Sequence, residues 1–251
     1  MFARETGAQQ LADGVVRVGT DVVNWYLLEQ DGKVTVVDAG APAYRPQLEP
    51  GLRKLGRELS DLEAVVLTHA HADHIGVAEK LRTELGVRVL VHEADEQLAT
   101  TRKPFGKNEA SALPYLRHRA AWKLLAHLAT AGGIPPKIER VETFADGQEL
   151  DVPGRPRVLH APGHTMGHVA LHVPARGVLF AGDLLCTWNP LTGARGPQLM
   201  PRAFNLSSAT ILDSLTKIQD LDAGLILVGH GDPWTQGPRA AVERARQVGP
   251  T

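Results

Sequence analysis

The chain has 251 residues, 43% hydrophobic and 22% charged, which is ordinary for a globular protein and sufficient for one substantial core. A formal net charge of −1, with no long run of lysine and arginine, argues against nucleic acid as a partner. One cysteine excludes an internal disulfide framework. No apolar stretch approaches the ~20 residues of a membrane-spanning helix, and residues 1–10 lack the apolar region of a secretory signal. We therefore expect a cytoplasmic protein that does not act at a membrane.

The first part of the chain predicts strands with helices between them. Short segments rich in valine or aromatic residues and bounded by glycine or aspartate favour strands. Apolar residues at helical spacing favour the helices. In chain order we expect strands at 14–18, 21–28 and 33–37, a helix at 44–55, a strand at 64–67, a helix at 75–85 and a strand at 88–91.

The second part begins with a helical insert at about residues 104–136, where leucine and alanine recur at helical spacing and glycine and proline pairs end the pattern. Beyond it we expect strands at 157–160, 169–173 and 178–181, little regular structure over 184–205, a helix capped by Ser207 or Ser208, a strand at 225–228 and a helix at 239–248. Two batches of strands, each with helices, predict two sheets stacked face to face with helices outside, in a single domain spanning 1–251.

Histidine is the unusual residue of this sequence, with eleven in the chain. They are clustered rather than scattered. The first cluster is His69, His71 and His74, the second is His160, His164, His168 and His172, and His230 stands in a third segment.

The first cluster lies in the segment 68–74, Thr-His-Ala-His-Ala-Asp-His, directly after the expected strand 64–67. On a helix, His69 and His71 would point in nearly opposite directions, whereas on a loop leaving a strand they can converge. Imidazole is a good ligand for zinc, iron and nickel, and the Asp73 carboxylate adds an oxygen donor. The pattern therefore predicts a metal site at the end of this strand.

This segment resembles the first metal-binding motif of the metallo-β-lactamase superfamily, and further matches follow in the expected order. The segments that carry the resemblance are Pro-Gly-His-Thr-Met-Gly-His at 162–168, Phe-Ala-Gly-Asp at 180–183, Val-Gly-His-Gly at 228–231 and the acidic turn Val-Asp-Ala-Gly at 37–40. The resemblance runs from about residue 15 to 234. It implies an αββα sandwich of two mixed β-sheets flanked by helices, with the metal site at one edge of the sheets.

The resemblance also implies a role for each matching residue. His69, His71 and His164 would bind a first metal ion, Asp73, His74 and His230 a second, and Asp183 would bridge the two. Such paired ions lie ~3.5–4 Å apart and share a water or hydroxide that attacks an electrophilic carbon or phosphorus. We expect two divalent ions, zinc first and manganese, iron or nickel as alternatives, and Asp73 is also placed to move a proton.

Residues beside the expected ligands have supporting roles in this interpretation. Asp38 is expected to hold a ligand histidine from behind and fix its tautomer. His168 is expected to be a structural, hydrogen-bonded histidine rather than a ligand. Trp188 and Asn189, on the loop after Asp183, are candidates for the substrate pocket, and Cys186 is interpreted as a small buried thiol.

The helical insert falls where this superfamily often places a lid over the site. Its basic residues Arg117, Arg119 and Lys123 could attract an anionic substrate. A solvated face or a contact between copies, such as a homodimer, is an equally open interpretation.

Departures from the superfamily's sequence patterns reduce the number of reactions that this chain could catalyse. Ala70 stands where flavodiiron-type oxygen reductases carry glutamate, and true β-lactamases do not normally use a bridging aspartate such as Asp183. The ligand set looks most like glyoxalase II and the lactonases. The basic, glutathione-binding C-terminal segment of glyoxalase II is not found in this sequence. The corresponding part of the chain offers only Arg239, Arg244 and Arg246.

The first hypothesis is therefore a dinuclear hydrolase that cleaves an ester, thioester or lactone in a small-molecule substrate. A mononuclear iron persulfide dioxygenase, which resembles glyoxalase II and keeps the same ligand residues, is the alternative enzyme. A catalytically inactive binding module on the same fold is the third hypothesis.

Overall fold

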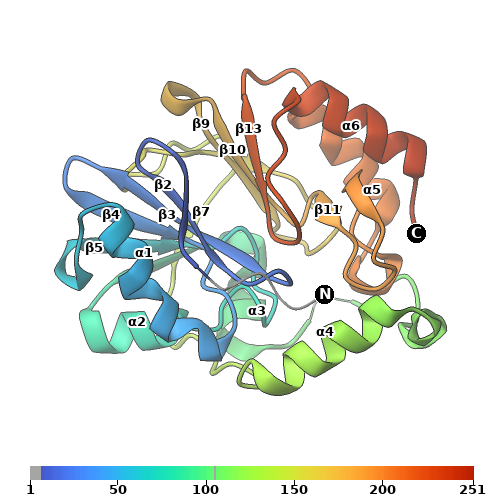
Figure 1. The fold of residues 1–251 in the computed structure, drawn as a ribbon, viewed down its shortest axis with the longest axis horizontal. Helices are drawn as coiled ribbons and strands as arrows, with labels where there is room; N and C mark the ends of the chain where they lie inside the picture. The colour runs from blue at the N-terminus through green and yellow to red at the C-terminus, as the bar shows by residue number, and fades with distance from the viewer. Residues whose placement is uncertain (1–6, 105) are drawn as a thin grey trace.

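The structure is a computed structural model that describes residues 7–104 and 106–251. Residues 1–6, part of the segment in which a secretory signal was sought, and residue 105 within the insert lie outside the described residues. The described chain forms two large sheets between two layers of helices (Figure 1).

The first sheet has seven strands in the order β1-β2-β3-β4-β5-β6-β7 over the described residues. The strands are β1 (Gln9–Ala12), β2 (Val15–Gly19), β3 (Asn24–Gln30), β4 (Lys33–Val37), β5 (Leu62–Val66), β6 (Arg88–His92) and β7 (Glu142–Phe144). Strands β1 to β4 pair antiparallel, and β4 to β7 pair parallel. The carboxyl ends of β4, β5 and β6 therefore meet at one edge of this sheet.

The second sheet has four strands in the order β13-β10-β9-β8 among the residues described. They are β8 (Arg157–His160), β9 (Val169–Val173), β10 (Val178–Gly182) and β13 (Leu225–Val228), and a separate pair consists of β11 (Cys186–Trp188) and β12 (Arg195–Gln198). Strand β10 pairs parallel with β13 and antiparallel with β9, so this sheet is mixed like the first.

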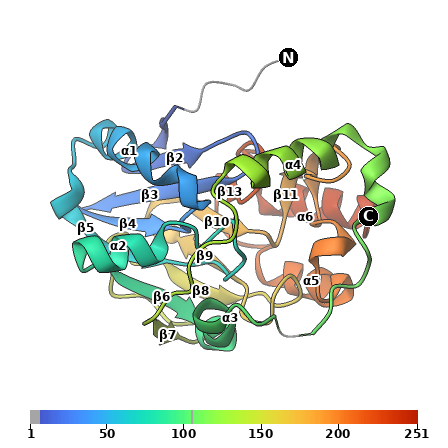
Figure 2. The ribbon, with the colours of Figure 1, turned by 90° about the horizontal axis from the view of Figure 1, so that it is seen from below.

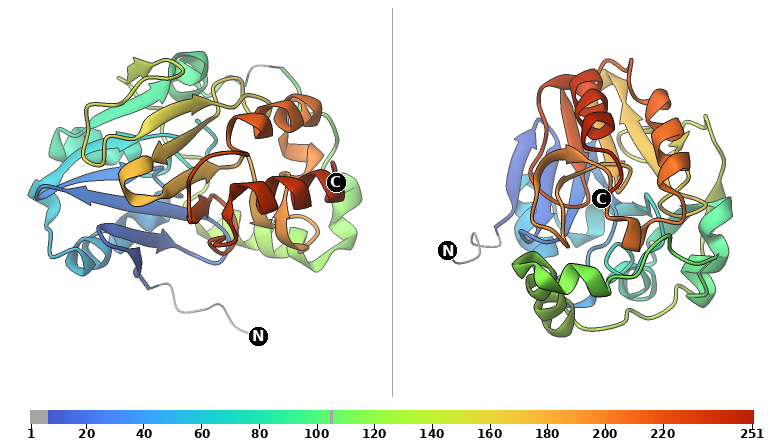
Figure 3. Two further views of the ribbon diagram at one scale, coloured as in Figure 1. Left: turned by 90° about the horizontal axis from the view of Figure 1, so that it is seen from above. Right: turned by 90° about the vertical axis from the view of Figure 1, so that its right-hand side faces the viewer.

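Six α-helices cover the sheets in the described part of the chain. They are α1 (Leu48–Lys54), α2 (Ala78–Leu85), α3 (Glu96–Thr101), α4 (Arg119–Thr130), α5 (Ser208–Ser214) and α6 (Gly237–Val248). In Figure 1, α1 and α2 lie beside the first sheet and α5 and α6 beside the second. Figure 3 shows the same layers from two further directions.

Three apolar clusters hold these four layers together, and strand periodicity explains them. Along β5, Val65 contributes to the cluster under α1 and α2, whereas Val66 contributes to the cluster between the sheets. Along β10, Phe180 faces the first sheet and Leu179 faces α5 and α6. Alternate side chains of a strand point to opposite faces, and here both faces are covered, which explains why β10 is apolar throughout and β5 is apolar except for Glu63. The expected αββα sandwich of two mixed sheets is confirmed.

Several expected boundaries are wrong, for reasons visible in backbone hydrogen bonds. The strand expected at 21–28 begins only at β3, because Thr20 Oγ1 accepts from the amides of Val22 and Val23 in a turn. The helix expected at 75–85 begins only at α2, because Gly76 and Val77 donate to the loop after β4. The helix expected at 44–55 is a 3-10 turn over 42–47 followed by α1.

The expectation of little regular structure over 184–205 is also wrong, since this segment contains β11, β12 and a short 3-10 turn. Strands β1 and β7 were not anticipated, because each is too short to show a period in the sequence. Helix α5 begins as expected, with the Ser207 side chain accepting from the amide of Thr210 at its N-terminus. No helix in residues 7–104 and 106–251 is both long and apolar enough to cross a membrane.

The helical insert forms one wall at the end of the two sheets, with α4 lying across β11 (Figure 2). Ala121 and Leu124 are buried against the first apolar cluster, and Lys123 Nζ lies 5.1 Å from the Trp188 ring. The outer face is apolar as well as basic, because Trp122 is 59% exposed and Leu125 46%. This placement leaves both the lid and the contact between copies open as interpretations.

Candidate metal centre

All seven predicted metal ligands lie in loops that leave the carboxyl ends of strands. The segment 69–74 follows β5, His164 follows β8, Asp183 follows β10 and His230 follows β13. Backbone hydrogen bonds join the two sheets here, from Asn24 N to Gly229 O (2.8 Å) and from Val169 N to Thr68 O (2.8 Å). The topology therefore brings side chains more than 150 residues apart to one edge of the sandwich.

Asp183 lies at the centre of this group of side chains. Its Oδ2 atom is 3.3 Å from His164 Nε2, 3.3 Å from His230 Nε2, 3.6 Å from His74 Nε2 and 3.9 Å from His69 Nε2. A carboxylate with four imidazole nitrogens so close is placed between two sets of metal donors.

The donors form three overlapping groups, each with its ligand atoms within 4.8 Å of one another. These groups are His69, His71 and His164; His69, His74 and Asp183; and Asp73, His74 and His230. The first and third groups share no residue, and they match the two ligand sets that the sequence predicts. The middle group shares His69 with the first and His74 with the third, and it adds Asp183 between them.

Unpaired buried atoms show that these residues fit a cation. The Nε2 atoms of His69 and His74 and the Oδ1 atom of Asp183 are buried without a hydrogen-bond partner among the described residues. An unpaired buried polar group is expensive, so such atoms normally have a partner, which a divalent ion would supply. Gly229 is needed at this place, because a Cβ there would lie 2.1 Å from Asp183 Oδ1.

Asp38 orients His74 directly and His69 through Thr68, on the side of each ring that faces away from the site. Its Oδ2 accepts from His74 Nδ1 (2.9 Å), and its carboxylate accepts from the amide and the hydroxyl of Thr68. Because the Thr68 hydroxyl proton is directed to Asp38, Thr68 Oγ1 accepts from His69 Nδ1 (3.1 Å). Both imidazoles therefore carry their proton on Nδ1 and turn Nε2 into the site.

Two further histidines are oriented in the same manner by groups that the sequence did not reveal. His230 Nδ1 donates to the carbonyl of Val22 (2.6 Å), and His164 Nδ1 donates to Asn205 Oδ1 (3.0 Å). A backbone carbonyl leaves no trace in a sequence, and Asn205 lies in a segment without periodic pattern, so no signal pointed to either.

Burial and mutual repulsion keep part of the cluster neutral. Burial lowers the pKa of His69 well below its usual value, and the neighbouring His74 and His164 lower it further. Burial and His164 lower the pKa of His71 to about 3. His71 Nδ1 lies 2.9 Å from His164 Nε2, a separation that suits two nitrogens sharing one cation. These neutral imidazoles have the protonation state that metal binding requires.

The carboxylates have the opposite effect on the rest of the cluster. Burial would lower the pKa of His74, but Asp183, Asp38 and Asp73 raise it to about 10. Burial would raise the pKa of Asp183, but the imidazoles of His230 and His74 lower it well below its usual value. Asp183 is therefore an anion near neutral pH, which suits the bridging role predicted for it.

The site opens to solvent at the loop tip that carries Asp73. The Asp73 side chain is 20% exposed, whereas those of His69, His74 and Asp183 are 0 to 2% exposed. His71 is half-buried, and Ala72 between them is exposed. A substrate would therefore approach past Asp73.

His168 does not belong to any of the three donor groups. Its Nε2 accepts from the Asp183 backbone amide (2.9 Å), and its ring is fully buried. The side chain thus supports the backbone that presents Asp183.

Trp188 and Asn189 are both buried after Asp183. Asn189 Oδ1 accepts from the amides of Leu191 and Thr192, and its Nδ2 donates to Gln198 and Thr251. Asn189 therefore stabilises its own loop, and contact of either residue with substrate stays a prediction. Cys186 is buried and donates to a backbone carbonyl rather than facing the ligands.

Asp95 is a further buried carboxylate that the sequence analysis missed. It accepts from the Ala70 amide (3.1 Å), the Thr165 hydroxyl (2.7 Å) and the Gly167 amide (2.7 Å), and so joins the loops of the first two histidine clusters. A signal existed, since Asp95 follows β6, the parallel neighbour of the strand that carries the first cluster. Polar residues after adjacent parallel strands meet at one sheet edge.

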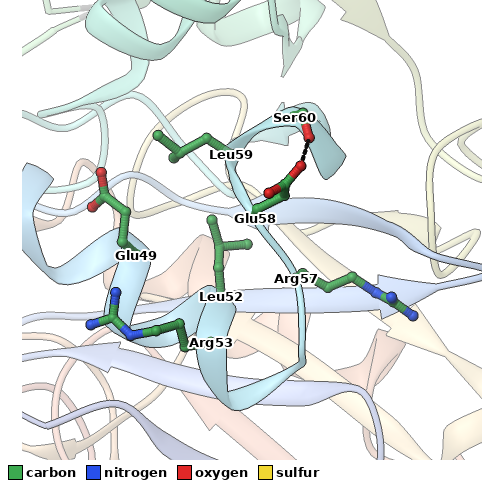
Figure 4. A pocket seen from close by; sticks show the side chains of 7 residues that line it. All are labelled: Glu49, Leu52, Arg53, Arg57, Glu58, Leu59 and Ser60. Atoms are coloured by element: carbon green, nitrogen blue, oxygen red, sulfur yellow. Dashed lines mark hydrogen bonds between the residues drawn. The ribbon is translucent and has the colours of Figure 1, made fainter.

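A depression of about 440 Å³ lies elsewhere on the surface, beside α1 (Figure 4). It is lined by Glu49, Leu52, Arg53, Arg57, Glu58, Leu59 and Ser60. Three of its charged groups have partners within the chain: Arg57 pairs with Glu29 (2.9 Å), Glu49 pairs with Arg45 (2.9 Å), and Glu58 accepts from the Ser60 hydroxyl (2.6 Å). None of the metal-site residues lines it.

Residues 18–230 match the family described as the metallo-beta-lactamase superfamily. Because the match spans most of the chain and the two-sheet fold and the histidine motifs agree with it, the protein belongs to the metallo-β-lactamase superfamily. The fold of this family implies divalent metal binding, and the three donor groups could hold such ions.

Curated relatives place the chain among metal-dependent hydrolases. The probable metallo-hydrolase YflN of Bacillus subtilis strain 168 is 26% identical over 246 residues, which cover 90% of this chain and 87% of the relative. The hydroxyacylglutathione hydrolase of Rhodobacter capsulatus is 29% identical over 188 residues, covering 75% of this chain and 53% of that enzyme.

Solved structures agree with this fold. The metallo-beta-lactamase family protein TTHA1429 from Thermus thermophilus is 29% identical with a TM-score of 0.63, and the alignment covers 92% of this chain and 77% of that one. The metallo-beta-lactamase SMB-1 is 18% identical with a TM-score of 0.69, covering 96% and 95% of the two chains. The second likeness shows the shared fold alone.

Proposed function

We propose that the protein is a hydrolase whose paired metal centre activates water against a carboxylic ester, a thioester or a lactone. The observation that supports this most is the position of Asp183 Oδ2, within 3.9 Å of four imidazole nitrogens and between two separate donor groups. In this proposal His69, His71 and His164 would hold one ion, Asp73, His74 and His230 would hold the second, and Asp183 would be shared by the two.

Two bound divalent cations, zinc most readily, lower the pKa of a shared water so that hydroxide is available at neutral pH. The chain's own contribution is orientation. Asp38, Val22 and Asn205 each accept an Nδ1 proton, so that the Nε2 atoms of three histidines face the same carboxylate. Preset donors lower the cost of reorganisation during the reaction.

Asp73 is the proposed acid–base residue as well as a ligand. Its Oδ2 lies 3.5 Å from His230 Nε2, and it is the more exposed of the two site carboxylates. At the mouth of the site, its carboxylate can take a proton from the attacking water and pass it to the departing alkoxide or thiolate.

The choice of an acyl bond rests on the ligand set and on the relatives. The Rhodobacter capsulatus relative is named for hydrolysis of hydroxyacylglutathione, which supports an acyl substrate here. The three arginines of α6 give glutathione itself no support. Arg239 pairs with Asp220, and Arg244 and Arg246 donate to backbone carbonyls of this chain.

The test is hydrolysis of a panel of lactones, thioesters and phosphoesters by protein reconstituted with zinc or manganese. We expect turnover of the acyl substrates, its loss on chelation and its return with added metal. Oxygen consumption on a persulfide by protein with one iron per chain would instead establish the dioxygenase. Protein that binds no metal and turns over none of these compounds would establish the inactive binding module.

A further inference from the structure

The helical insert is connected to a metal-site histidine by a chain of hydrogen bonds that is buried as far as Ser208 and ends at the partly exposed carboxylate of Glu109. His164 Nδ1 donates to Asn205 Oδ1 (3.0 Å), Asn205 Nδ2 donates to Ser208 Oγ (3.2 Å), and Ser208 Oγ donates to Glu109 Oε2 (2.6 Å). His164, Asn205 and Ser208 are at most 2% exposed. Glu109 belongs to the insert, so the chain of bonds runs from the site into a segment that holds none of the predicted ligands.

The direction of each bond is fixed by its neighbours. Asn205 Nδ2 also donates to the Met200 carbonyl (2.7 Å), which can only accept, so the amide must present Oδ1 to His164. Asn205 Oδ1 can only accept, so His164 carries its proton on Nδ1 and keeps Nε2 free. Glu109 ends the chain, with Oε1 accepting from the Ser208 amide (2.9 Å).

We propose that Glu109 and Ser208 are positioning residues that act through Asn205, which fixes the tautomer of His164, to strengthen the His164 Nε2 atom as a metal ligand. A histidine ligand whose other nitrogen donates toward a carboxylate is a better donor to the metal. Here the carboxylate is two residues removed, and the low dielectric of the interior lets successive hydrogen bonds polarise one another. The inference rests on the proposed metal centre.

The insert provides a matched control for this proposal. Asn108, next to Glu109, donates from Nδ2 to the Ala203 carbonyl (2.6 Å) and so fastens the insert to the same segment. It has no bond to Asn205, Ser208 or His164. Loss of anchoring alone would therefore make Asn108→Ala resemble Glu109→Gln, whereas polarisation of His164 would not.

The experiment compares full-length wild type, Glu109→Gln, Ser208→Ala and Asn108→Ala by competition for Zn²⁺ with a chromogenic chelator. We expect Glu109→Gln and Ser208→Ala to weaken one of two zinc equivalents by about 10-fold, at the lower end of the range for such supporting residues. The double variant should show little more than either single change, because both interrupt one chain. Asn108→Ala should bind as wild type does.

A second measurement determines the protonation and hydrogen bonding of His164 Nδ1 in the metal-free protein. In ¹⁵N-histidine-labelled, metal-free protein, NMR should show His164 protonated at Nδ1 in wild type and in Ser208→Ala, because Met200 still orients Asn205, with the Nδ1 resonance of the variant shifted toward that of a more weakly hydrogen-bonded imidazole. Unchanged zinc affinity in Glu109→Gln and Ser208→Ala, or an equal loss in Asn108→Ala, would overturn the proposal. Wild type that binds no zinc would overturn the proposed function instead, while the NMR measurement would still decide whether the chain of bonds acts on His164.

Discussion

Asp183 is the residue on which four site histidines converge, and its removal is the most informative single change. Asp183→Ala leaves the two donor groups without their shared carboxylate, so hydrolysis should fall by orders of magnitude, and metal content should fall as well. Turnover and elemental analysis measure the two effects. The matched control is Asp220→Ala, which removes an exposed carboxylate paired with Arg239. Wild-type turnover in Asp183→Ala would disprove the bridging role.

Asp95 supports the site through backbone and hydroxyl groups rather than through the ligands. Asp95→Ala would leave three donors without their acceptor, and we expect a loss of about 2–4 kcal/mol in the free energy of unfolding. Urea unfolding of the metal-free protein measures it. The neighbouring Glu96 is exposed, so Glu96→Ala should change stability by less than about 0.5 kcal/mol. Equal stability of the two variants would mean that Asp95 does not join the loops. Gly167 belongs to this arrangement, since a Cβ there would lie 2.5 Å from the Asp95 nitrogen.

Substitution of His168 distinguishes a role in supporting the metal site from a role as a metal ligand. His168 Nε2 accepts from the Asp183 amide. His168→Ala should therefore clearly lower the melting temperature but reduce the metal content per chain only slightly. Loss of one metal equivalent with an unchanged melting temperature would instead identify His168 as a ligand.

At the scale of elements, a pair of histidines joins strands of different sheets. The rings of His92, at the end of β6, and His160, at the end of β8, stack 4.1 Å apart at 8°. Burial lowers the pKa of His92 to about 4, and His160 and Lys217 add to this, while Glu93 and Asp146 oppose it. The stack therefore requires His92 to be neutral.

This pair predicts a contribution to acid instability. The unfolded chain binds a proton at His92 near its usual pKa of 6.5, whereas the folded chain does so only near 4. The unfolded state thus binds more protons in this window, and the free energy of unfolding should decrease as pH falls from 6.5 to 4. His92→Phe keeps a ring in the stack and should show a smaller decrease in urea titrations at several pH values. An identical pH dependence in both proteins would contradict this assignment.

Strand ends explain why much of the site could be predicted from the sequence. The histidine motifs follow β5, β8, β10 and β13, and β10 and β13 are apolar runs that can be recognised in the sequence because both of their faces are covered. Helix starts were less predictable, as at α2, because the amides of Gly76 and Val77 bond to the loop after β4. Long-range backbone pairing of this kind has no local signature.

At the scale of the whole molecule, the order of layers followed from two batches of strands with helices and from the family resemblance. The sequence could not predict the groups that orient the ligand histidines through hydrogen bonds. Asn205, Glu109 and the Val22 carbonyl reach the site from segments without motifs, and their roles depend on which way one side chain or carbonyl points. Asp95 could have been anticipated from its place after β6.

The central claim is that five imidazoles and two carboxylates, which the fold gathers at one edge, hold two metal ions. Elemental analysis of protein purified without chelator, followed by titration of the metal-free chain with zinc and manganese, tests it most directly. We expect two equivalents per wild-type chain, and no more than one in Asp183→Ala. A single iron per wild-type chain, or none retained even in excess zinc or manganese, would contradict it.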